Sequence, residues 1–146
     1  MLKINNMLKV TVIVIFITMG ILFSQTREPC VAGQFYPGSA KKLRMTCQHY
    51  LNQAGSQSLS SKPIAILAPH AGYVYSGRIA GISFNEIRGY KYDAIIIMAP
   101  SHTHSFSFAS IYGGEYYKTP LGKMKVEQKL AQDIAAMNKN IKISNQ

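Results

Sequence analysis

The sequence predicts an α/β protein with a parallel or mixed sheet and flanking helices. Two short apolar runs, residues 63–67 and 94–98, have the length and the β-branched side chains of strands buried on both faces. A helical pattern lies between them, from about residue 77 to 88, and Gly89 supplies its end signal. A strand, a helix and a second strand, extending over residues 92–98, predict a right-handed parallel crossover unit. Ile79, Ile82 and Ile87 are expected to face inward from this helix.

The segment before the first strand predicts one more helix. Residues 27–38 are expected to be extended, because Pro29 and the Pro37-Gly38 pair interrupt regular structure. Ser39 is a suitable N-cap for a helix over residues 40–54. Its apolar residues recur at helical spacing: Leu43, Cys47, Tyr50 or Leu51, and Ala54.

The segment after the second strand predicts a further strand and a helix. Residues 106–112 alternate enough for a strand, which the Gly113-Gly114 pair would end. Residues 125–137 carry one apolar face of a helix, formed by Val126, Leu130, Ile134 and Met137. Residues 138–146 show no partner in a core.

Length and composition limit the class of protein. The chain has 146 residues, enough for one domain, and a hydrophobic fraction of 47% excludes a disordered or fibrous protein. Its net charge of +10 raises the question of nucleic-acid binding. The Lys and Arg residues are scattered and form no stripe interleaved with aromatic residues. We therefore expect a solvated basic surface and no nucleic-acid partner.

The N-terminus has the features of a secretory signal. Residues 1–25 combine Lys3 and Lys9 with an apolar run over residues 10–23 and a polar exit. Fourteen residues of helix would span about 21 Å, short of the hydrocarbon core of about 30 Å. We expect an exported or periplasmic protein whose folded domain covers residues 27–146. The cleavage site is imperfect, so an anchor that attaches the chain to the cytoplasmic membrane is the alternative.

Two histidines occupy equivalent places in the predicted sheet. His70 follows the first strand in Ala68-Pro69-His70, and His102 follows the second in Ala99-Pro100-Ser101-His102. Ligands of open α/β sheets gather at the carboxyl ends of the strands. Imidazole is the commonest protein ligand for zinc, copper and non-haem iron. These residues predict a metal site at the sheet edge, against the simpler interpretation of two hydrogen-bonded structural histidines.

Other polar residues of these turns are candidates for catalysis. Tyr73 and Ser101 bring hydroxyl groups to the same edge, where they could orient a substrate or transfer a proton. His104 is a weaker candidate, because Thr103 separates it from His102 and an extended turn would point it the other way. His49, within the first predicted helix, is expected at the surface. Cys30 and Cys47 show no zinc-binding spacing, and a buried thiol or a disulfide remain alternatives for them.

Several blocks of the sequence, taken together, resemble the Memo family, known in bacteria as protein B of the AmmeMemoRadiSam set. The blocks are Arg27-Glu28-Pro29, Ala32-Gly33-Gln34-Phe35-Tyr36-Pro37, Ala68-Pro69-His70-Ala71-Gly72-Tyr73-Val74-Tyr75-Ser76-Gly77, Ala99-Pro100-Ser101-His102 and Tyr117-Lys118-Thr119-Pro120-Leu121-Gly122. They follow the family's order and spacing from residue 27 to the C-terminus.

The resemblance implies an α/β fold similar to class III extradiol dioxygenases and a site for a redox-active metal, iron or copper. The family's metal-binding histidines match His70 and His102. Its remaining site residues lie in a C-terminal half that has no counterpart here, so the resemblance implies a truncated sheet and an incomplete site. We therefore expect a Memo-like, dioxygenase-like oxidoreductase that is inactive as this fragment, acting on a small molecule or a peptide. A non-catalytic protein that binds a peptide or a small ligand is the alternative.

Overall fold

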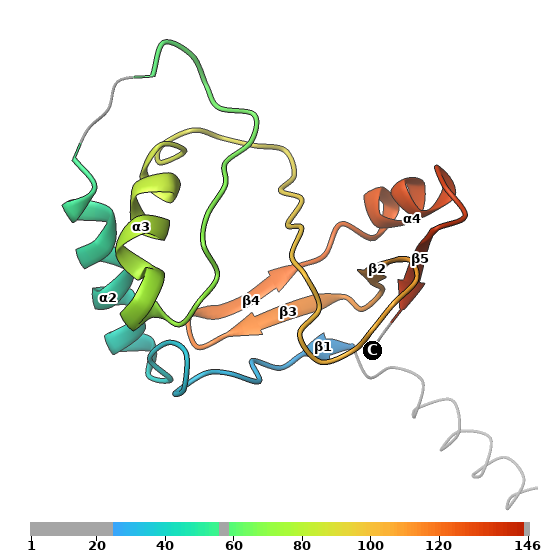
Figure 1. The fold of residues 1–146 in the computed structure, drawn as a ribbon, viewed down its shortest axis with the longest axis horizontal. Coiled ribbons are helices and arrows are strands. Elements are labelled where there is room, and N and C mark those ends of the chain that lie inside the picture. The colour runs from blue at the N-terminus through green and yellow to red at the C-terminus, as the bar shows by residue number, and fades with distance from the viewer. Residues whose placement is uncertain (1–24, 56–58, 145–146) are drawn as a thin grey trace, which may run out of the picture.

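The computed structural model describes residues 25–55 and 59–144, and they form a mixed α/β fold (Figure 1). This confirms the predicted fold class. The described helices are α2 (Ala40–Gln53), α3 (Tyr73–Asn85) and α4 (Gln128–Ala136). The described strands are β1 (Thr26–Arg27), β2 (Ala109–Tyr112), β3 (Tyr116–Thr119), β4 (Gly122–Lys125) and β5 (Ile141–Ser144).

The predicted signal or anchor lies outside the described residues, except for Gln25. Within residues 25–55 and 59–144, no helix combines the length and the apolar character that crossing a membrane requires.

The strands form two small sheets. In the first, the order is β1-β3-β4, with β1 parallel and β4 antiparallel to β3. In the second, β2 and β5 pair in parallel, so that Ile111 lies opposite Ile143. Helix α4 packs against β5 and β2. The structure thus contains parallel and antiparallel pairs, as a mixed sheet was expected to.

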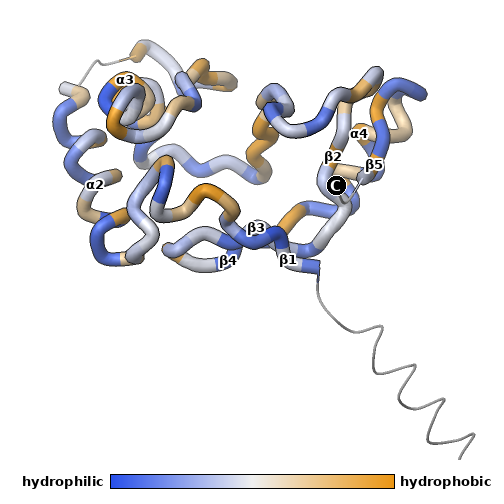
Figure 2. The backbone as a smooth tube through the Cα atoms, turned by 60° about the horizontal axis from the view of Figure 1, so that its bottom comes forward, coloured by the Kyte–Doolittle hydropathy of each residue, from blue (hydrophilic) through white to orange (hydrophobic). Residues whose placement is uncertain are grey.

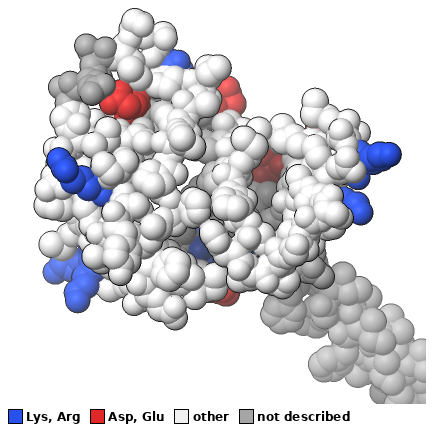
Figure 3. Space-filling model, viewed as in Figure 1, with Lys and Arg blue, Asp and Glu red and all other residues white. Residues whose placement is uncertain are grey.

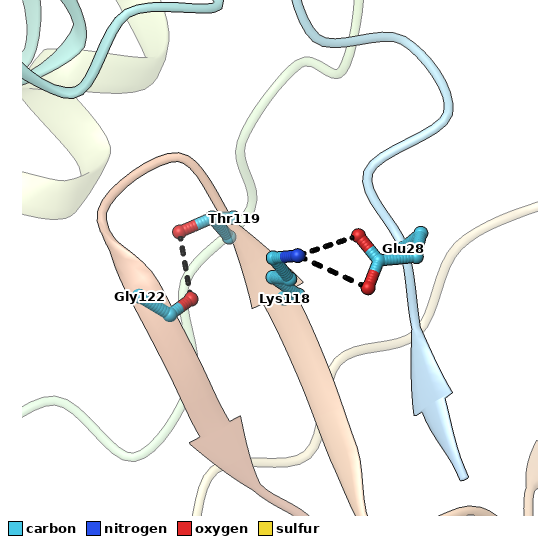
Figure 4. Close-up of polar contacts among 4 residues, drawn as sticks. All are labelled: Glu28, Lys118, Thr119 and Gly122. Atoms are coloured by element: carbon cyan, nitrogen blue, oxygen red, sulfur yellow. Dashed lines mark hydrogen bonds and ion pairs between the residues drawn. The ribbon is translucent and has the colours of Figure 1, made fainter.

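Side-chain contacts join Arg27 and Glu28 to the neighbouring strands β2 and β3. Lys118 on β3 forms an ion pair with Glu28, with Nζ 2.9 Å from Oε2 and 3.1 Å from Oε1 (Figure 4). The guanidinium of Arg27 lies 5.8 Å and 5.9 Å from the ring centroids of Tyr112 and Tyr117, within range of a cation–π contact. These contacts hold Arg27 and Glu28 in place just before the turn over residues 31–36.

Helices α2 and α3 pack closely against each other (Figure 1). The helix predicted over residues 40–54 is confirmed as α2, and Leu43 is buried as expected. Helix α3 begins at Tyr73, four residues before its predicted start at residue 77. Its buried residues are Ser76, Gly77 and Gly81, whereas Ile79 is 53% exposed. The prediction that Ile79 faces inward is therefore wrong, because small residues allow α2 to approach on the other side of the helix.

The two strands predicted over residues 63–67 and 92–98 are absent. Both segments lack regular secondary structure, and among the described residues neither joins a strand ladder or a backbone–backbone hydrogen bond. The predicted parallel crossover unit is therefore wrong, and only its helix is present. The physical reason is that a strand needs backbone hydrogen bonds to a neighbour. The two segments approach each other only through side-chain contacts, such as that of the Tyr92 hydroxyl with the Pro63 carbonyl oxygen.

Further predictions about the remaining segments need correction. Of residues 27–38, only Arg27 belongs to a named strand. A compact turn follows, in which Gly33 has a φ of 84° and its N–H donates to the Tyr36 carbonyl oxygen. The hairpin of β3 and β4 was not predicted, and β2 starts three residues later than the strand predicted from residue 106. Residues 141–144, for which no partner was visible, pair with β2, and α4 is shorter than the predicted helix over residues 125–137.

Basic residues are dispersed on the face that Figure 3 shows. The blue Lys and Arg atoms form separate patches, with uncharged surface between them. On that face, the charge has the scattered distribution expected from the sequence.

Candidate metal site

His70 and His102, which follow segments 63–67 and 92–98, lie against each other. Their Nε2 atoms lie 3.2 Å apart, and their ring centroids lie 5.3 Å apart with the planes tilted by 42°. The residues are 32 positions apart in sequence, and both are exposed. The proximity expected from the sequence is therefore present, although no sheet produces it.

The His70 turn is held by contacts at the start of α3. The Ser76 hydroxyl donates to the Ala71 carbonyl oxygen at 2.9 Å, and the Tyr73 N–H donates to the Phe35 carbonyl oxygen at 2.7 Å. Gly72 lies close to the same Phe35 carbonyl, since a Cβ atom there would be 3.4 Å from the oxygen. The turn over residues 31–36 thus supports the backbone beside His70.

The His102 turn is held by Ser101, whose hydroxyl oxygen accepts a hydrogen bond from the His104 N–H at 3.1 Å. The His104 ring lies against Phe106, with centroids 6.1 Å apart, and its Nδ1 lies 2.9 Å from the Thr103 hydroxyl. In the described structure, Ser101 and His104 have these local partners, and no recorded contact joins either to the histidine pair. Their catalytic roles stay predictions.

Tyr73 points its ring into a cluster between α2 and α3. Its ring centroid is 5.8 Å from that of Tyr36 and 6.3 Å from that of Tyr50, whose hydroxyl donates to the Tyr73 carbonyl oxygen at 3.0 Å. The Tyr73 hydroxyl lies 3.7 Å from Sγ of Cys47. No recorded contact between described residues joins this ring to His70 or His102, and its catalytic role stays a prediction.

Burial and neighbouring groups keep the Tyr73 phenol protonated. Burial is the main cause, followed by the contact with Cys47 and the charges of ionised Cys47 and Tyr36, and together they raise the pKa of Tyr73 to about 12. Burial, and then the charge of ionised Cys30, raises the pKa of Tyr36. At neutral pH the Tyr73 hydroxyl therefore acts as a hydrogen-bonding group and not as a base.

Sequence reasoning missed Cys47 as a partner of Tyr73. The signal was present, because Cys47 shares the helical spacing of Leu43 and Tyr50 and so belongs to the inner face of α2. Cys30 and Cys47 are both free thiols in the structure, so no disulfide joins them. His49 is exposed on α2, as predicted.

The geometry of the histidine pair fits one shared metal ion. Imidazole nitrogens bind zinc at about 2.0–2.1 Å, which places two nitrogens on one ion about 3–3.5 Å apart. The observed separation of 3.2 Å lies in this range. It also fits a direct hydrogen bond between one protonated and one unprotonated nitrogen. Among the described residues, no group of three or more His, Cys, Asp or Glu surrounds a common point.

Comparisons with known proteins identify a family and relatives that match most of the chain. A family model described as Memo-like protein matches residues 27–146. A MEMO1 family protein of Thermoplasma volcanium is 36% identical over 108 residues, covering 74% of this chain and 39% of the relative. A MEMO1 family protein of Pyrococcus abyssi is 37% identical over 114 residues, covering 77% of this chain and 39% of the relative. One of Methanocaldococcus jannaschii is 37% identical over 122 residues, covering 76% and 42%.

The chain matches about two fifths of the length of these relatives. The match contains His70, His102 and the segments that position them, because the family model begins at Arg27 and continues to Gln146. The chain therefore belongs to the Memo family.

Proposed function

We propose that this chain carries part of a Memo-type metal site, in which His70 and His102 bind iron or copper for a dioxygenase-like redox reaction. The observation that supports it most is the 3.2 Å separation of the two Nε2 atoms. Neutral imidazole suits both metals, and such an ion would supply redox chemistry and polarise substrate oxygen. Both rings are exposed, so an ion can reach them from solvent.

Two imidazoles alone do not make a complete catalytic site, since such sites usually have three or more protein ligands. We propose that the chain by itself binds the metal weakly and is inactive. Ser101, Tyr73 and His104 are proposed to line the site and to orient a small-molecule or peptide substrate. The N-terminal segment is proposed to direct export or to attach the domain to the membrane.

Metal titration tests the assignment. Calorimetry with Cu²⁺, and with Fe²⁺ under anaerobic conditions, is expected to give one site per chain. His70→Ala and His102→Ala should each weaken binding about tenfold or more, because each removes a ligand. His49→Ala is the matched control, since it removes an exposed imidazole on α2. Unchanged affinity in the double variant His70→Ala/His102→Ala, or an equal loss in His49→Ala, would contradict the proposal.

A non-catalytic binding protein is the alternative outcome. Metal-dependent oxygen uptake by a full-length version supports the oxidoreductase. Binding of a peptide or small ligand that survives chelation, without turnover, would favour the binding protein instead.

A further inference from the structure

Two stretches of chain lead to the paired histidines, and the second has little to hold it in place. We call residues 63–70 the first segment and residues 92–102 the second segment. In the second segment, Tyr92 is half-buried and every other residue is exposed, including Ile97 at 80% and Met98 at 90%. Figure 2 shows such hydrophobic stretches on connecting segments as well as on the labelled helices. Burial of apolar side chains therefore does not explain where the second segment lies.

Tyr92 and Lys62 join the starts of the two segments. The Tyr92 hydroxyl donates to the Pro63 carbonyl oxygen at 2.8 Å. The Lys62 ammonium lies 4.2 Å from the centroid of the Tyr92 ring, in a cation–π contact, and donates to the Lys91 carbonyl oxygen. We call the side chains of Lys62 and Tyr92 the clamp. Among the described residues, the clamp and the histidine pair provide every recorded hydrogen bond and ring contact between these two stretches of chain.

The first segment is fixed to the helix pair. The Ser83 hydroxyl of α3 donates to the Leu67 carbonyl oxygen at 2.7 Å, and the Ser76 hydroxyl donates to the Ala71 carbonyl oxygen just after His70. Helix α3 in turn packs on α2. In Figure 1 both segments descend between α3 and the strands. The helix pair therefore holds the first segment, and the clamp holds the second segment against the first.

Contacts at the two ends of the same pair of segments support each other. With the clamp formed, Tyr92 lies beside Pro63, and only the residues from there to the histidines must be ordered for the rings to meet. Without it, the preceding side-chain tether is Arg88, whose guanidinium donates to Oδ1 of Asn52 on α2 at 3.3 Å. The free chain would then be longer and would no longer start beside the first segment. Both changes lower the chance that the rings meet.

We propose that Lys62 and Tyr92 are positioning residues of the candidate metal site. The clamp holds the second segment along the first and thereby sets the separation of the His70 and His102 rings. This inference rests on the proposed function only for its metal readout, because the ring separation is measured without metal.

The ring contact is measured first, on the full 146-residue chain with a chelator present. Centroids 5.3 Å apart predict a nuclear Overhauser effect between the ring protons of His70 and His102. The clamp variant Lys62→Met/Tyr92→Phe should lose most of this effect, because it removes the cation and the hydroxyl. Lys62→Arg should keep it, because it keeps the cation.

The matched control is Tyr90→Phe/Lys91→Met, which changes the same two residue types beside the clamp. In the described structure, the recorded contacts of these two residues involve their backbones and not their side chains. The control should keep the ring contact, and the contact between the Tyr50 and Tyr73 rings should persist in every variant as evidence of an intact helix pair. A ring contact that survives in the clamp variant, or an equal loss in the control, would overturn the proposal.

Copper titration then tests the clamp through the metal. The clamp variant should bind Cu²⁺ about fivefold more weakly than the unchanged chain, the loss expected for one net hydrogen bond. The same substitutions should have no effect in a His102→Ala background, because they act through His102. An equal loss in that background would overturn the proposal. Absence of Cu²⁺ binding by the unchanged chain, beside a ring contact that is lost with the clamp, would contradict the proposed function and support the clamp.

Discussion

Tyr73 shows how one residue can serve a structural role that its position in the sequence conceals. The motif places it two residues after Ala71, beside the His70 turn, yet its ring contacts Tyr36, Tyr50 and Cys47. Its N–H reaches back to Phe35, so the same residue joins the 31–36 turn to the start of α3. Tyr73 therefore connects the support of His70 to the packing of the two helices.

The raised pKa of Tyr73 makes stability depend on alkaline pH. Because the folded pKa is about 12 and the ordinary value is 10, the folded state holds the phenolic proton more tightly than the unfolded state does. This contribution is complete below pH 10 and is lost as the pH rises toward 12. Urea unfolding at several pH values should show a smaller alkaline loss of stability for Tyr73→Phe than for the unchanged chain.

The control for this prediction is Tyr75→Phe, at a neighbouring tyrosine that is 87% exposed. Tyr75→Phe should keep the alkaline loss of the unchanged chain. The assignment to Tyr73 would be wrong if both substitutions reduced the loss equally.

The α2–α3 pair depends on two glycines that meet different parts of one residue. A Cβ at Gly77 would lie 2.8 Å from Cζ of the Tyr50 ring, whereas one at Gly81 would lie 2.8 Å from the Tyr50 carbonyl oxygen. Both distances are far below van der Waals contact. The first obstacle belongs to a side chain and the second to the backbone of α2.

This difference predicts the outcome of a double-mutant experiment. Gly77→Ala and Gly81→Ala should each destabilise the protein by about 1–3 kcal/mol through overpacking. In a Tyr50→Ala background, Gly77→Ala should become neutral or slightly stabilising, because alanine is the better helix former. Gly81→Ala should stay destabilising, because the backbone of residue 50 remains. Thermal unfolding measures both cycles, and equal coupling in the two would contradict the packing described here.

The elements that could be predicted from sequence are those whose signals are local. The Pro37-Gly38-Ser39 sequence directly precedes α2, and the spacing of Leu43, Cys47 and Tyr50 lies within it. The predicted bounds of this helix agree with the structure to within one residue. Segments 63–67 and 92–98 carry an equally clear strand pattern but form no ladder. Strand formation depends on a partner backbone elsewhere, which a single segment cannot encode.

The residues of the candidate site also differ in how far their positions could be predicted from the sequence. The meeting of His70 and His102 was predicted from their positions after two expected strands, and it is observed although those strands are absent. The position of Tyr73 depends on a tertiary contact with Cys47, which the order of the motifs does not encode. Ser101 and His104 instead have local partners within residues 101–106. The metal-binding role of the pair stays a prediction that the titration decides.

At the scale of the whole molecule, the described elements separate into three groups: the α2–α3 pair, the sheet of β1, β3 and β4, and the layer of β2, β5 and α4. The two groups that contain strands meet through the rings of Tyr112 and Tyr117, whose centroids lie 4.8 Å apart. Among the described elements, neither α2 nor α3 contacts a strand or α4, so segments 63–67 and 92–98 and the 31–36 turn provide the connections. Groups with so few shared contacts are expected to open independently.

Hydrogen exchange under native conditions tests this independence. Amides of α2 and α3 should exchange with one common free energy of opening, and those of β2, β5 and α4 with another. Gly81→Ala should accelerate exchange in the first group only, since it disturbs the contact between α2 and α3. Equal acceleration in both groups would show that the domain unfolds as a single cooperative unit.

The uncovered sequence Ala94-Ile95-Ile96-Ile97-Met98-Ala99 has a consequence for the fate of the chain in a cell. A six-residue stretch of high β propensity, with neither charge nor proline, is suited to stacking with identical copies into amyloid fibrils. Holdase chaperones and proteases compete for such a stretch, so the steady-state abundance of the isolated chain depends on how quickly it is shielded after synthesis.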